Sequence, residues 1–113
     1  MATNRLVQMS KVEVYAGVLF DAANEGGIDE VLAVRNQFSE LLRIIYSDLD
    51  LNMALTGTQY SADERYQLVE AVLADVIEPL REVIAVMSRN GDASLITRVY
   101  HEYENVKIGR ASC

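Results

Sequence analysis

The sequence is poor in the residues that support covalent, metal and redox chemistry. Its 113 residues include one cysteine, one proline, one histidine and no tryptophan. The cysteine, Cys113, is the last residue, and alone it builds neither an internal disulfide nor a zinc site. The single histidine, His101, leaves no histidine dyad or metal-binding pair. We therefore expect no catalytic residue, no cofactor and no metal.

Long apolar runs and an excess of positive charge are also missing. No stretch approaches the roughly 18 apolar residues that cross a bilayer, and residues 1–9 show no signal-peptide pattern. The net charge of −7 opposes nucleic-acid binding, which depends on Lys and Arg at phosphates, and suits a basic partner segment. We expect an intracellular protein that binds no nucleic acid and does not insert directly into a membrane.

Half of the residues are hydrophobic, and they recur at helical rather than strand spacing. The pattern predicts an all-α fold, a six-helix bundle in a single domain with short loops. The expected helices cover about 11–24, 28–47, 48–55, 62 to a break before 79, 79–89 and 93–105.

Helix-start signals support several of these bounds. Capping boxes are expected at Ser10 with Glu13 and at Ser61 with Glu64, and Asp92 is expected to cap the last helix.

The first expected helix is apolar on two faces. One stripe is typical of a helix that packs on a core, and it contains Val12, Tyr15, Ala16, Leu19, Phe20 and Ala23. Val14, Val18 and Ala22 form a second stripe at i, i+4 and i+8. Either more of this chain or a partner must cover it. Gly17, in mid-helix, favours a close helix approach, either within this chain or with a partner.

The fifth expected helix repeats this feature. Leu80, Ile84 and Met87 make its core stripe, while Val83 and Val86 lie to one side, followed by Asn90. Two helices with surplus apolar flanks can form a groove for a third amphipathic helix. The alternative is that these flanks face another helix of the bundle.

The remaining polar and sulfur-containing residues do not indicate a catalytic site. The acidic residues are dispersed over polar faces, which predicts solvated surfaces. Met53 and Met87 are expected to fill the core. The tyrosines are expected to lean on the bundle with their hydroxyls in water; these are Tyr46, Tyr60, Tyr66, Tyr100 and Tyr103.

Two segments resemble the δ subunit of F-type ATP synthases, the family of the oligomycin-sensitivity-conferring protein. That family opens with Tyr-Ala, small residues, then Leu or Phe and an acidic residue, as residues 14–25 do (VYAGVLFDAANE). Its second signature is an apolar helix that ends with a charged residue, followed by Asn-Gly or Asn-Arg, as in residues 84–91 (IAVMSRNG). The resemblance spans about 12–105. Asp92-Ala93 and the proline-free loop 56–58 depart from the family pattern.

The resemblance implies a non-catalytic stator component of a proton-translocating ATP synthase. It would link the catalytic head to the peripheral stalk by binding N-terminal amphipathic helices of α subunits between its first and fifth helices. Carried over to this sequence, the groove consists of Val14, Tyr15, Val18, Ala22, Val83, Val86 and Asn90.

The resemblance also implies a domain plan and a location. Residues 1–10 would be a tail, 11–105 the six-helix N-terminal domain, and 106–113 a truncated linker toward a missing C-terminal domain that contacts the stalk b subunit. The complex would lie at the cytoplasmic face of the bacterial plasma membrane, with this subunit peripheral.

Two other function classes remain open from the residues alone. A generic helical interaction or regulatory module would show the same apolar flanks. A small enzyme with all-carboxylate chemistry would need convergent acids, whereas this sequence offers dispersed ones.

Overall fold

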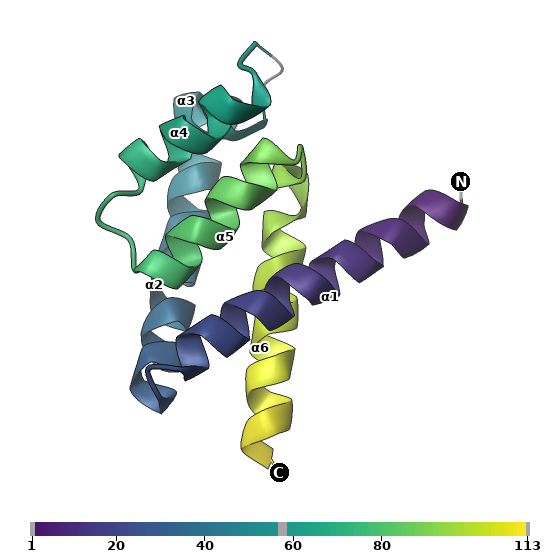
Figure 1. The fold of residues 1–113 in the computed structure, drawn as a ribbon, viewed down its shortest axis with the longest axis vertical. Coiled ribbons are helices and arrows are strands. Elements are labelled where there is room, and N and C mark those ends of the chain that lie inside the picture. Colours follow the sequence, from purple (N-terminus) through teal and green to yellow (C-terminus); the bar gives the residue numbers. More distant parts are fainter. Residues whose placement is uncertain (1, 57–58, 113) are drawn as a thin grey trace.

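The computed structural model describes the backbone of residues 2–56 and 59–112 and the side chains of residues 8–56 and 59–106. Within these residues the fold is all-α, as predicted, with six helices and no strand (Figure 1). A short 3-10 turn, η1 (Ala93–Leu95), precedes the last helix. The helices are α1 (Ala2–Asn24), α2 (Ile28–Ser47), α3 (Leu49–Thr56), α4 (Ala62–Val72), α5 (Glu78–Arg89) and α6 (Ile96–Ser112).

Several helix bounds follow from local sequence chemistry. Helix α2 has the predicted bounds, and Gly27 precedes it with φ of 90°, a conformation that favours glycine. The capping box before α4 is confirmed, because Glu64 N donates to Ser61 Oγ at 3.2 Å and Ser61 N donates to Glu64 Oε1 at 2.9 Å. Pro79 lies in the first turn of α5, where its missing N–H costs nothing.

Two predicted caps are wrong. Ser10 lies inside α1, which begins at Ala2 instead of Lys11, because no glycine or proline interrupts the good helix formers before it. Asp92 makes no side-chain capping bond, because η1 intervenes before α6. The Asp92 carboxylate is instead hydrogen-bonded to two side chains of α1. The loop at 57–58 and Cys113 lie outside the described residues.

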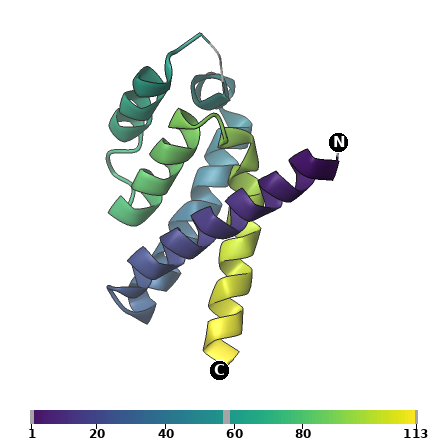
Figure 2. The ribbon, with the colours of Figure 1, turned by 45° about the vertical axis from the view of Figure 1, so that its right-hand side comes forward.

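The core lies between α1, α2, α5 and α6. Both ribbon views show α1 crossing α6, with the N-terminal end of α1 extending beyond the bundle (Figures 1 and 2). The completely buried core side chains come from all four of these helices; they include Ala16, Leu19, Val31, Val34, Phe38, Leu80, Ile84, Met87, Val99 and Tyr103.

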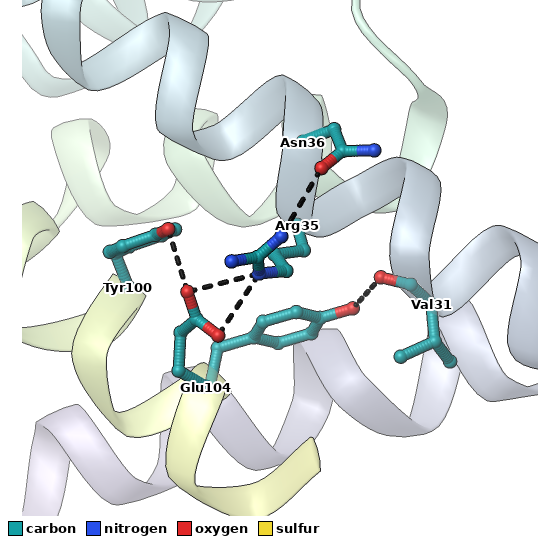
Figure 3. Close-up of polar contacts among 6 residues, drawn as sticks. Val31, Arg35, Asn36, Tyr100 and Glu104 are labelled. Carbon is teal, nitrogen blue, oxygen red and sulfur yellow. Dashed lines mark hydrogen bonds and ion pairs between the residues drawn. The ribbon is translucent and has the colours of Figure 1, made fainter. Parts of the chain in front are cut away.

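Polar contacts join α2 to α6 (Figure 3). Arg35 Nε lies 3.1 Å from both carboxylate oxygens of Glu104, which also accepts a 2.7 Å bond from the Tyr100 hydroxyl. Tyr103 is completely buried and its hydroxyl donates to Val31 O at 2.6 Å, so the expectation of a hydroxyl in water is wrong here. Burial raises the pKa of Tyr103 to about 12.

One further expectation from the sequence is wrong, and one is wrong in part. Met53 is 49% exposed, whereas Met87 is buried as predicted. A Cβ placed on Gly17 would have no neighbouring atom within 4 Å, so this glycine does not permit a close helix approach within the domain.

Candidate functional site

The two apolar stripes of α1 have different environments. On the inner stripe, Ala16 and Leu19 are completely buried, and Tyr15 is half-buried. On the outer stripe, Val14 is 62% exposed and Val18 is 55% exposed. Their exposure means that no other described part of this chain covers the outer stripe.

Helix α5 contributes less exposed apolar surface than its sequence suggested. Val86 is half-buried and Asn90 is exposed, but only 7% of Val83 is exposed. Helix α5 packs against both α4 and α1, and Val83 lies within that packing. Val83 is therefore part of the core as well as part of the groove wall, and the interpretation of this residue as a free flank is wrong.

A polar network fixes one end of the contact between α1 and α5. Lys11 Nζ lies 3.1 Å from Asp92 Oδ1, and the Tyr15 hydroxyl donates to Asp92 Oδ2 at 2.7 Å. Asn90 Nδ2 donates to the Tyr15 hydroxyl at 3.0 Å. Burial, together with the neighbouring Asp92 carboxylate, raises the pKa of Tyr15. The network holds the start of the inner stripe of α1 against the end of α5.

A cavity of about 500 Å³ opens at the other end of the same two helices. Val18 and Ala22 of α1 line it with Ile77, Pro79 and Val83 at the start of α5. Lys11 and Tyr15 of α1 contact Asn90 and Asp92 at the end of α5, whereas Val18 and Ala22 line the cavity with the start of α5. The two helices therefore run antiparallel (Figure 2).

The structure thus brings together most of the predicted site residues. Val18, Ala22 and Val83 line the cavity, while Tyr15 and Asn90 are bonded to each other at the opposite end. Val14 lies on the exposed stripe of α1, and Val86 is half-buried on α5. Neither Val14 nor Val86 lines the cavity.

Sequence reasoning missed the charged residues of this site. The cavity is also lined by Gly26 and by four glutamates, which are Glu25, Glu30, Glu78 and Glu82. The spacing of Glu78 and Glu82, one helical turn apart, was the available signal, because i, i+4 residues share a helix face. The Lys11–Asp92 contact spans 81 positions, and no local pattern predicts it.

Among the described residues, no group of three or more His, Cys, Asp and Glu side chains is arranged to hold a metal ion. His101 is exposed on α6, with its ring 5.5 Å from that of Tyr100. No helix within the described part of the chain has the length and apolarity needed to span a membrane.

A second apolar surface lies between α2, α3 and α4. A cavity of about 260 Å³ is lined there by Leu41, Leu51 and Val76, with the more exposed Ile44 and Val72. Ile44 is 46% exposed and Val72 is 52% exposed. This surface matches the outer stripe of α1 in exposure, and it shares no lining residue with the cavity between α1 and α5.

Comparison with known families gives one match. The family described as ATP synthase delta (OSCP) subunit matches residues 12–111. This range contains α1 from Val12 onward and the whole of α5, so both helices of the candidate groove lie inside it. No curated protein and no solved structure matches the chain.

Proposed function

Because the chain belongs to the ATP synthase delta (OSCP) subunit family, we propose that it binds N-terminal helices of α subunits in the groove between α1 and α5. The family consists of structural, non-catalytic subunits of the ATP synthase peripheral stalk. In this role the domain ties the catalytic head to the stalk. We place the complex at the cytoplasmic face of a bacterial plasma membrane.

The exposed outer stripe of α1 is the observation that supports this proposal most strongly. Val14 and Val18 are more than half exposed although they sit in a strongly apolar segment, residues 14–23, of which eight are hydrophobic. Full burial of an exposed valine side chain contributes about 1.5–3 kcal/mol, and each of these two valines forgoes more than half of that free energy. A partner helix that covers these residues recovers that free energy, and the adjacent cavity at Val18 and Ala22 offers it a socket.

A titration with a synthetic peptide of the cognate α-subunit N-terminal helix tests the proposal. We expect the parent chain to bind the peptide by calorimetry, and Val18→Asp to weaken binding by at least about 30-fold, because the new carboxylate would be desolvated under the peptide. Val18→Asp should lower the free energy of unfolding by no more than about 1 kcal/mol, since the position is exposed.

Val72→Asp is the matched control. Val72 is 52% exposed, close to the 55% of Val18, but it lies on the second apolar surface. The control variant should bind the peptide like the parent. Equal losses of peptide affinity in both variants, or a loss in Val72→Asp alone, would show that the peptide does not bind in the groove between α1 and α5.

A further inference from the structure

The two ends of the groove between α1 and α5 differ in charge. At the Tyr15 end, the buried Asp92 carboxylate is paired with Lys11 Nζ at 3.1 Å. At the cavity end, four of the ten lining residues are glutamates and none is Lys or Arg. At the Tyr15 end of the groove the negative charge is neutralised by an ion pair, whereas at the cavity end the negative charges are not neutralised.

The glutamates at the cavity end have no cationic partner within the described residues. Glu25 and Glu78 are exposed, and neither has an ion pair there. Arg81 is the nearest base along α5, but its Nε lies 3.0 Å from Glu70 and its Nη1 donates to backbone carbonyls. Glu82 accepts only a neutral donor, the Tyr66 hydroxyl, at 2.7 Å.

The carboxylates surround an apolar floor. Val18 and Ala22 of α1 lie in the same cavity as Ile77 and Pro79. A neutral helix seated on this floor would displace water from the nearby carboxylates without replacing the lost interactions, and an acidic helix would be repelled. A second copy of this chain is also disfavoured, because both copies carry a net charge of −7.

We infer that the occupant of this groove is an amphipathic helix that places lysine or arginine side chains at one end, over Glu25, Glu78 and Glu82, while its apolar stripe covers Val18 and Ala22. This inference rests on the proposed function and adds the chemistry of the partner. The basic residues are confined to one end, because the opposite end already carries Lys11. The charge pattern thus sets the register and direction of the bound helix, and the apolar stripe supplies most of the affinity.

Two synthetic helical peptides with the same apolar stripe test this inference. One carries three lysines at one end, and the other carries three glutamines at the same positions. We expect the parent chain to bind the lysine peptide about tenfold more tightly at about 0.05 M salt. The preference should shrink to about twofold at about 0.5 M salt, because exposed charges are then screened.

A double variant of the chain, Glu25→Gln with Glu78→Gln, should lose most of the preference for lysine. Both residues are exposed, so the fold tolerates the change. The matched control is Glu40→Gln with Asp50→Asn, which also removes two negative charges, but from exposed positions on α2 and α3. The control variant should keep the full preference, which would exclude an effect of net charge alone.

The outcomes separate this inference from the proposed function. Equal binding of both peptides by the parent, with binding still lost in Val18→Asp, would overturn the inference and leave the proposed function standing. An equal loss of preference in the double variant and its control would overturn it as well. Failure of the parent to bind the lysine peptide and the α-subunit peptide would overturn both.

Discussion

The two faces of α1 carry the same kinds of side chain in opposite environments. Leu19 and Ala16 on the inner face are completely buried, while Val14 and Val18 on the outer face are 62% and 55% exposed. The difference shows that apolar periodicity identifies which faces of a helix are hydrophobic, but not whether the same chain or a partner covers each face. A helix with one apolar stripe is satisfied by its own domain, whereas the second stripe of α1 remains available to a partner.

The largest expected effect comes from the inner face. Leu19→Asp should unfold the domain or lower its free energy of unfolding by at least about 4 kcal/mol, because a carboxylate would be buried without a partner. Chemical denaturation followed by circular dichroism measures this loss. A Leu19→Asp domain as stable as Val18→Asp would erase the distinction between the two faces.

The polar end of the groove gives the next largest effect. Asp92 is 8% exposed and is bonded to Lys11 and Tyr15. Asp92→Ala should lower the free energy of unfolding by about 2 kcal/mol, because hydrogen bonds to a charged group are among the stronger ones. Asp92→Asn retains an acceptor and should lose about half as much. Equal stability of all three proteins would show that the network does not hold α1 against α5.

A smaller effect is expected from the bond between α6 and α2. Tyr103→Phe should cost about 1 kcal/mol, because it removes one buried hydrogen bond and no volume from the core. The pKa of Tyr103 is about 12 in the folded chain and about 10 in the unfolded chain, so the folded state favours the neutral hydroxyl. This contribution to the free energy of unfolding is fully present below about pH 10 and is lost as the pH rises through about 12. Urea unfolding should therefore show the deficit at pH 8 and a smaller one at pH 11. A deficit that does not change with pH would mean that folding does not raise the pKa of the Tyr103 hydroxyl.

The smallest predicted effect is an increase in the free energy of unfolding. Gly17 lies inside α1, and a Cβ there would meet no atom within 4 Å. Gly17→Ala should raise the free energy of unfolding by about 0.5–1 kcal/mol through helix propensity and a less flexible unfolded chain. Thermal unfolding of the two proteins side by side measures the gain. A loss of stability would place a neighbour against this part of α1.

Local sequence chemistry was sufficient for much of the fold. The expected range of α2, the capping box at Ser61 and the helix start at Pro79 each agree with the helix bounds that the structure shows. The same capping pattern failed at Ser10, because a box caps a helix only where the preceding chain leaves helical dihedrals. Nothing before Ser10 forces the chain out of the helix.

The candidate site was predictable only in part. Helical spacing predicted the second apolar stripe of α1 but not the exposure of Val14 and Val18, because it left open whether this chain or a partner covers them. The burial of Val83 could not be predicted from spacing either, because it depends on how α5 packs against its neighbours in the bundle. The role of Asp92 depends on a contact with Lys11 across the whole chain, so a residue that looked like a helix cap is a tertiary ion-pair partner.

Chemical-shift mapping tests the central claim most directly, because it locates the bound helix on the surface of the folded chain. The amide resonances of the isotope-labelled protein are followed while the α-subunit N-terminal peptide is added. We expect the largest shifts along the outer face of α1 and the facing side of α5, at Val14, Val18, Ala22 and Val86, and small shifts at Ile44 and Val72. Shifts that gather at Ile44 and Val72 instead would contradict the assignment of the groove between α1 and α5.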